Sequence, residues 1–176
     1  MNTIRRLAAR LRHADDGVAA VEFSLLCAIF SAGLLNAGEL SRYAFVSMQA
    51  ANATQAGAAA ALAACDVAHV PATVSCPGLN DAVSTALQGT SLGSHVALNG
   101  PLTEGYYCLN DHHVLVSVSG PSSPPADCSV VDNPLGAPAL YLILATTYTY
   151  TPMFPGLTVV DTLPHKVANT AWMRMK

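Results

Sequence analysis

Residues 17–23 read Gly-Val-Ala-Ala-Val-Glu-Phe, and the apolar run that starts there continues to Gly38. Among the 21 positions from 18 to 38, Glu22 is the only charged residue. At about 1.5 Å of rise per residue, a helix of this length spans roughly 30 Å, which is the thickness of the hydrocarbon core of a bilayer. The stretch therefore predicts a single transmembrane helix.

The segment before this run is basic. Four arginines are opposed there only by Asp15 and Asp16; they are Arg5, Arg6, Arg10 and Arg12. Positive charge beside a membrane span is retained in the cytoplasm. We therefore expect the N-terminus in the cytoplasm and everything after the span on the exported side.

Glu22 is an unusual residue for a membrane span, since a carboxylate there costs at least ~2.5–3.5 kcal/mol even on lenient insertion scales. A glycine, four small or aliphatic residues, Glu-Phe and a hydrophobic helix resemble the processing site of type IV pilin-like precursors. With its short Arg-rich leader, the site is most similar to that of the TadE/TadF-like minor pilins (pseudopilins) of the tight-adherence, Flp-type pilus. The resemblance implies that a prepilin peptidase cuts between Gly17 and Val18, so that Glu22 becomes the fifth residue of the mature chain.

The resemblance extends beyond the processing site. Residues 38–42, Gly-Glu-Leu-Ser-Arg, match the acidic-then-Arg membrane exit of the family, and the Ala-rich residues 49–64 match the helix beyond it. Residues 148–152 and 172–174 also resemble the family's tail. Ala28 departs from the pattern, because many members have a proline at this position. Residues 66–138 have no such match.

The resemblance implies a structural protein and not an enzyme. It would be a subunit or assembly component of a thin adhesive pilus, with Glu22 and Phe23 as its processing and assembly motif. Its expected partners are a prepilin peptidase, other pilin-like subunits, the assembly platform and the bacterial cytoplasmic membrane. The C-terminal domain would lie outside the cytoplasm, with incorporation into the pilus left open.

Small residues recur at every fourth position of the predicted span. They are Ala20, Ser24, Ala28 and Ala32. Such spacing produces one narrow face on which helix backbones approach closely, although alanine is abundant throughout this chain. We therefore predict a helix-packing face along these residues.

Other interpretations of the run stay open at this stage. It could be the buried core helix of a soluble protein, or a secretory signal that ends near residues 36–38, although Glu22 is a poor fit to such a signal. The rival function is a membrane-anchored extracytoplasmic domain that binds a ligand and has no connection with pili. A secreted enzyme is a weaker alternative.

Charge excludes one class of partner. Without residues 1–17, the formal charge falls from −3 to −5, because four Arg and two Asp are removed. No basic patch then remains, so nucleic acid is not an expected partner. Only 11% of the residues are charged, which suits a surface that packs against other subunits.

The chain has five cysteines. Cys27 lies in the apolar run and is expected to be a small apolar filler. The other four lie on the predicted exported side, where disulfides persist, and sequence alone allows three pairings among them. We favour Cys65–Cys76 and Cys108–Cys128, because both close short loops, and each would stabilise the fold by roughly 2–4 kcal/mol.

The sequence divides into a leader (1–17), a helix that crosses the membrane and protrudes from it (18–64), and an exported α+β domain (65–176). Alanine-rich sequence without proline predicts that the helix continues unbroken to residue 64, although Gly57 could bend it. A second, short helix is expected at residues 79–87, capped by Asn80 or Asp81.

Alternating apolar residues predict a small antiparallel sheet after this short helix. One strand is expected around Tyr106, Tyr107 and Leu109, and the others at residues 112–118, 140–151 and 167–173. A long proline-rich loop at 122–138 and a turn at 152–156 would connect them. The expected fold is therefore α+β, with a long N-terminal helix followed by a sheet domain stapled by disulfides.

Two patterns resemble catalytic or metal sites. Residues 89–93, Gly-Thr-Ser-Leu-Gly, fit the letters of a nucleophile elbow, but that turn must join a buried strand to a helix, and here a helix precedes it. His112 and His113 are adjacent and would point to opposite faces of a strand, although Asp111 or His165 could join one of them. We expect no metal, no cofactor and no small-molecule substrate.

Overall fold

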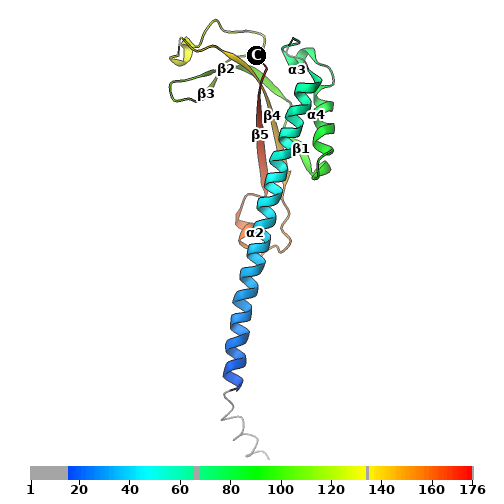
Figure 1. The fold of residues 1–176 in the computed structure, drawn as a ribbon, viewed down its shortest axis with the longest axis vertical. Helices are drawn as coiled ribbons and strands as arrows, with labels where there is room; N and C mark the ends of the chain where they lie inside the picture. Colours follow the sequence, from blue (N-terminus) through cyan, green and yellow to red (C-terminus); the bar gives the residue numbers. More distant parts are fainter. Residues whose placement is uncertain (1–15, 66–67, 134, 176) are drawn as a thin grey trace, which may run out of the picture. The chain divides into compact units, whose positions relative to one another are not determined.

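We describe the protein from a computed structural model that covers residues 16–65, 68–133 and 135–175. The first element among these residues is α2 (Asp16–Ala64), an uninterrupted helix of 49 residues. The sequence favours this length because it holds no proline and is rich in alanine after Arg42. The helix passes Ala28 and Gly57 without a break, as predicted (Figure 1).

The remaining elements are short helices and five strands. The helices are α3 (Ala72–Ser75), α4 (Leu79–Gln88) and the 3₁₀ turns η1 (Gly93–His95), η2 (Ser129–Val131) and η3 (Val159–Thr162). The strands are β1 (Val96–Leu98), β2 (Thr103–Leu109), β3 (Leu115–Ser119), β4 (Ala139–Thr149) and β5 (Lys166–Arg174). The expected α+β class, with a long N-terminal helix and a small antiparallel sheet, is therefore confirmed.

β4 is the central strand of the sheet. β5 pairs antiparallel with β4 along nearly the whole length of β4, from Tyr141↔Arg174 to Thr149↔Lys166. The other edge of β4 is shared, since β1 pairs with residues 146–148 and β2 with residues 139–143. β3 completes the sheet by pairing with β2, with an irregularity in register between Tyr106 and Tyr107.

The contacts divide the chain into two compact units, each of which we describe by itself. The helix unit contains the residues up to Arg42 together with Pro152–Leu163, and the sheet unit contains Tyr43–Thr151 and Pro164–Lys176. The end of α2 at Ala64 agrees with the predicted end of the helix. The compact units do not coincide with the predicted division at residue 64. The segment Pro152–Leu163, between β4 and β5, belongs with the N-terminal part of α2.

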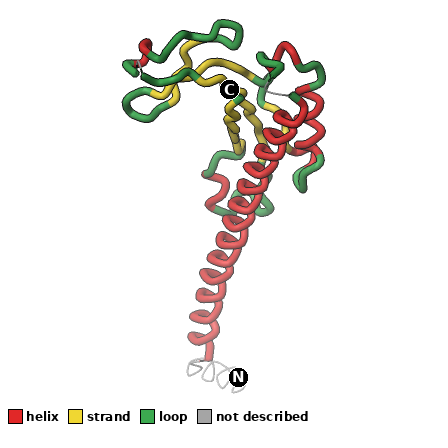
Figure 2. Tube along the Cα trace, turned by 45° about the horizontal axis from the view of Figure 1, so that its top comes forward, coloured by secondary structure: helices red, strands yellow, loops and turns green. Residues whose placement is uncertain are grey.

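The core of the sheet unit lies between one face of the sheet and two helices. Alternate β4 residues are fully buried there, namely Leu140, Leu142 and Leu144. Small α2 residues pack against them, which allows the helix to approach closely: a Cβ added at Gly57 would lie 3.0 Å from Leu144 Cδ2. α4 lies beside α2 and contributes Val83 and Leu87 to the same core (Figures 1 and 2).

Two local predictions were wrong, and one strand was not predicted. His112 and His113 lie in a turn before β3 and not on a strand, and His113 has a positive φ of 58°, a conformation outside the strand region. The cap of α4 is Gly78, with φ of 88°, and neither Asn80 nor Asp81 caps the helix. β1 was not predicted because three residues are too few to show an alternating pattern.

Candidate functional site

The N-terminal part of α2 exposes its apolar side chains. From residue 17 to residue 35 every side chain is exposed, and the large apolar ones from Val18 to Leu34 are 60–71% exposed. Among the described helices, α2 is the one long and apolar enough to cross a membrane, and no part of its most apolar window is buried. This segment is therefore a candidate membrane span.

Large apolar side chains surround most of this segment. At about 100° per residue, they leave one sector of roughly 100° free, between the directions of Leu34 and Leu35. Ala20 and Ser24 of the predicted packing face lie in this sector, whereas Ala28 and Ala32 lie on either side of Val21. All four are exposed, and the Ser24 hydroxyl donates to the carbonyl of Val21 at 2.8 Å, so it is satisfied within its own helix.

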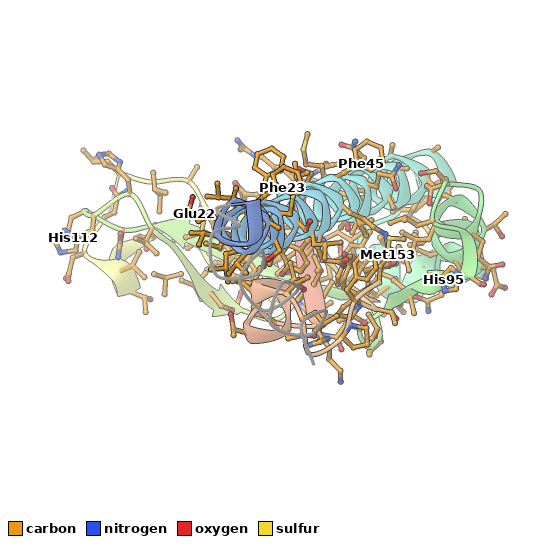
Figure 3. All side chains as sticks on the ribbon, turned by 90° about the horizontal axis from the view of Figure 1, so that it is seen from below. Glu22, Phe23, Phe45, His95, His112 and Met153 are labelled. Atoms are coloured by element: carbon orange, nitrogen blue, oxygen red, sulfur yellow. A yellow bond between two sulfur atoms is a disulfide. The ribbon has the colours of Figure 1, made fainter. Side chains whose placement is uncertain are left out.

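Glu22 and Phe23 both project outward from the helix (Figure 3). Phe23 is 70% exposed. Among the described residues, none forms an ion pair or hydrogen bond with the Glu22 carboxylate. By the same angular spacing, Glu22 lies on the side of the large apolar residues and not on the small-residue face.

The predicted cleavage site lies in the first turn of α2, because the helix begins at Asp16. Gly17 and Val18 are exposed, and a Cβ added at Gly17 would meet nothing within 4 Å. Within this structure, therefore, a larger residue at position 17 is tolerated. The predicted leader falls almost entirely on residues 1–15, which lie outside the described residues.

Two polar residues at the end of the apolar run hold a distant segment of the chain. Glu39 is only 2% exposed, and its Oε1 accepts a hydrogen bond from the amide of Met153 at 3.0 Å. The Arg42 guanidinium lies 3.7 Å from the same oxygen. One turn earlier, Asn36 Oδ1 accepts from the amide of Val159 at 2.8 Å. From the sequence, we assigned the membrane exit to residues 38–42 but did not identify Asn36 as a contact residue. The one sequence feature that links Asn36 to Glu39 is their i,i+3 spacing, which places both on the same side of the helix.

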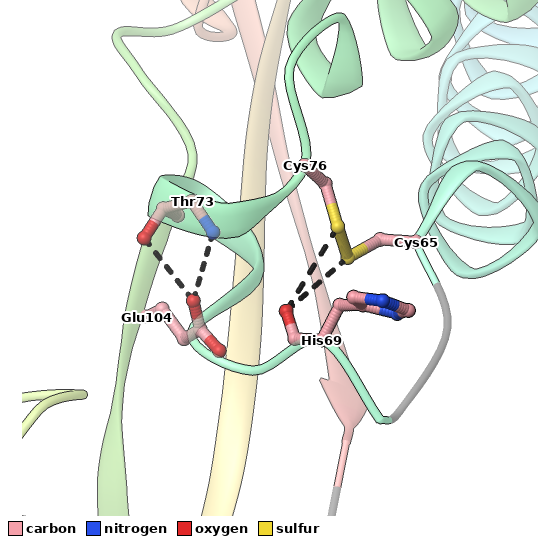
Figure 4. Close-up of a disulfide and its surroundings, with 5 residues drawn as sticks. All are labelled: Cys65, His69, Thr73, Cys76 and Glu104. Atoms are coloured by element: carbon pink, nitrogen blue, oxygen red, sulfur yellow. Dashed lines mark hydrogen bonds between the residues drawn. A yellow bond between two sulfur atoms is a disulfide. The ribbon is translucent and has the colours of Figure 1, made fainter.

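Two disulfides staple the sheet unit. They join Cys65 to Cys76 and Cys108 to Cys128, which is the pairing favoured from loop length. The first links the end of α2 to the segment after α3. Beside it, a Glu104 carboxylate oxygen on β2 accepts from both the amide and the hydroxyl of Thr73, at 3.0 and 3.1 Å (Figure 4). Together the disulfide and these hydrogen bonds attach α3 and the residue after it to the end of α2 and to β2.

The residues that resembled chemical sites are placed without a catalytic arrangement. Ser91 follows α4 in a turn, so it does not lie between a strand and a helix as a nucleophile elbow requires. His112 Nε2 lies 3.6 Å from Asp111 Oδ1, and both side chains are well exposed. Across residues 16–65, 68–133 and 135–175, no group of three or more His, Cys, Asp or Glu is placed to hold a metal ion.

An aromatic cluster lies on the sheet. Tyr107, Tyr141 and Trp172 come from β2, β4 and β5, and their ring centroids are 5.0–6.1 Å apart in edge-to-face geometry. Trp172 remains 46% exposed. Their alternation with the buried Leu140, Leu142 and Ala171 places the cluster on the face opposite the core.

Comparison of the chain with protein families, curated proteins and solved structures found no match.

Proposed function

We propose that this chain is a pilin-like structural or assembly protein of a tight-adherence type pilus, matured by a prepilin peptidase after Gly17. The observation that carries the proposal is that the two halves of α2 differ in exposure. Its residues 17–35 are exposed and apolar with a single carboxylate, whereas its residues beyond Tyr43 supply small side chains to the core of a disulfide-stapled sheet. A helix of this kind can serve both as a membrane anchor and as the spine of an exported domain.

In this proposal the membrane holds residues 18–38, with the N-terminus in the cytoplasm and the sheet unit on the extracytoplasmic side. The location of the disulfides supports this orientation, since disulfides persist outside the cytoplasm. The acidic Glu39 and basic Arg42 then mark the exit from the bilayer.

Cleavage after Gly17 would create a new amine at Val18. This amine and the carboxylate of Glu22 are opposite charges in a medium of low dielectric, where an unpaired charge is costly. Because Glu22 projects outward, the amine of a neighbouring subunit can neutralise it. The pairing would fix the register between adjacent subunits.

The small-residue face gives such subunits a surface for close packing. Ala20 and Ser24 lie in a sector of the span without large side chains, so that another helix can approach the backbone there, and Ala28 and Ala32 extend this face beside Val21. Glu22 and this face lie on different sides of the helix. A subunit could therefore contact one neighbour through its charge and another through its small residues.

The rival function, a membrane-anchored ligand-binding domain, is supported by the aromatic cluster of Tyr107, Tyr141 and Trp172, because partly exposed aromatic residues are enriched at binding surfaces. That function makes no use of Gly17 or Glu22.

A pair of glycine variants separates the two functions. Gly17→Leu and Gly33→Leu each place a large side chain where the structure has open space. With a prepilin peptidase co-expressed, we expect Gly33→Leu to be shortened like the wild type and Gly17→Leu to stay at precursor size. Wild-type protein whose size does not depend on the peptidase would refute the pilin proposal and leave the rival function.

A further inference from the structure

The segment Pro152–Leu163, between β4 and β5, exposes a group of apolar side chains. Leu157 is 71% exposed, Met153 60% and Val159 55%, and Phe154 is also partly exposed. Asp161 is the segment's only charged residue. An exposed surface of this composition, within twelve residues of chain, is unusual for a loop facing water alone.

The attachment of this segment to α2 fixes its level along the helix. The amides of Met153 and Val159 donate to Glu39 and Asn36, respectively. Both acceptors lie within the last turn of the apolar run or just after it. The segment and residues 16–42 belong to one compact unit, and Figures 1 and 2 show the segment beside the helix. Its apolar side chains therefore lie at the C-terminal end of the candidate span.

Several polar groups of the segment are satisfied internally or by α2, whereas the buried Thr158 hydroxyl has no partner among the described residues. Pro152 and Pro155 have no amide hydrogen to donate. The Asp161 carboxylate binds within the segment, where Oδ2 accepts from the amide of Gly156 at 2.6 Å. Six amides of the segment donate to acceptors elsewhere in the loop or on α2, namely those of Met153, Gly156, Leu157, Val159, Asp161 and Leu163. Backbone that contacts lipid must be satisfied in this way, because lipid offers no replacement for water.

We propose that Pro152–Leu163 is a second membrane contact, whose side chains of Met153, Phe154, Leu157 and Val159 enter the outer lipid interface where α2 leaves the bilayer. The proposal rests on the membrane span in the proposed function. The apolar surface of the segment adjoins that of the helix, so one lipid layer can cover both. The helix unit would thereby contact lipid through two parts of the chain, α2 and Pro152–Leu163.

Depth-dependent fluorescence quenching tests this contact in the full-length protein. In a Cys27→Ala background, Leu157→Cys is labelled with an environment-sensitive fluorophore and reconstituted into phosphatidylcholine vesicles. The vesicles contain lipids spin-labelled either near the headgroup or deep in the acyl chain. Ile29→Cys, in the middle of the span, and Val130→Cys, 78% exposed in the sheet unit, are the matched controls.

Interfacial groups lie about 5–10 Å into the boundary between headgroups and acyl chains, so we expect the shallow spin label to quench Leu157→Cys about twofold more than the deep label. Ile29→Cys should show the reverse preference. If Ile29→Cys is quenched by the deep label while Leu157→Cys stays at the level seen without spin label, the loop contact is refuted and the span stands. If Ile29→Cys is not quenched either, the span itself is wrong. If the fluorophore at Leu157→Cys reports an apolar environment only after other pilin-like subunits are added, the surface is a subunit contact, which also overturns the proposal.

Discussion

A pair of buried hydroxyls makes a sharp prediction about how α2 is joined to the sheet. Thr54 on α2 and Thr146 on β4 are each 1% exposed, and their hydroxyl oxygens lie 2.6 Å apart. Thr54 also donates its hydroxyl hydrogen to the carbonyl of Ala50 at 2.8 Å. Since a hydroxyl has one hydrogen, Thr146 must be the donor between the two threonines. The two residues therefore have unequal roles.

Replacement by valine keeps the shape of each side chain and removes its hydroxyl. Thr54→Val leaves the buried Thr146 hydroxyl without its acceptor, which should cost about 1–3 kcal/mol. Thr146→Val leaves the bond between Thr54 and Ala50 intact and removes one neutral hydrogen bond, worth about 0.5–1.5 kcal/mol. In the double variant neither hydroxyl is stranded, so its loss of stability should be smaller than the sum of the two.

The assay is chemical denaturation of the full chain in detergent micelles under non-reducing conditions, followed by the fluorescence of Trp172. We expect Thr54→Val to lower the free energy of unfolding more than Thr146→Val does. The double variant should lose less stability than the sum of the two single variants. Equal costs, a larger cost for Thr146→Val, or simple additivity would refute the assigned donor and the tight contact between helix and sheet.

Three further variants or modifications test other parts of the account. Thiol labelling under denaturing, non-reducing conditions should modify Cys27 alone, and labelling of any other cysteine would contradict the two disulfides. Glu39→Ala should release Met153 at a cost of about 1–3 kcal/mol and speed proteolysis of Pro152–Leu163, whereas an unchanged rate would show that the bond does not hold the segment. Glu22→Ala should be inserted and cleaved normally, because a charge penalty of ~2.5–3.5 kcal/mol is removed, but should co-purify less with other pilin-like subunits. Normal assembly of that variant would exclude the register role.

The elements predicted correctly from sequence are those with local or strongly periodic signals. α2 follows from its alanine content and lack of proline, and β4 follows from alternating leucines that the structure buries completely. The disulfide pairing could be favoured because closing a short loop costs little entropy. These signals each depend on residues close together in the sequence.

The parts that were missed depend on residues far apart in the sequence. Asn36 and Glu39 bind segments more than 110 positions away, and no local pattern in either region indicates the partner. β1 forms because the exposed edge of β4 at residues 146–148 accepts it, and its own three residues carry no strand signal. The turn of His112 and His113 depends on the Asn110 side chain, which accepts from the amides of His112 and Val114. Tertiary context decides all three.

The most direct test of the proposed function is the intact mass of the wild-type chain extracted from membranes that contain a prepilin peptidase. Processing after Gly17 predicts Val18 as the first residue, with both disulfides retained. A chain that still begins at Met1, or one that begins near Gly38 as a secretory signal would require, would contradict the pilin-like account.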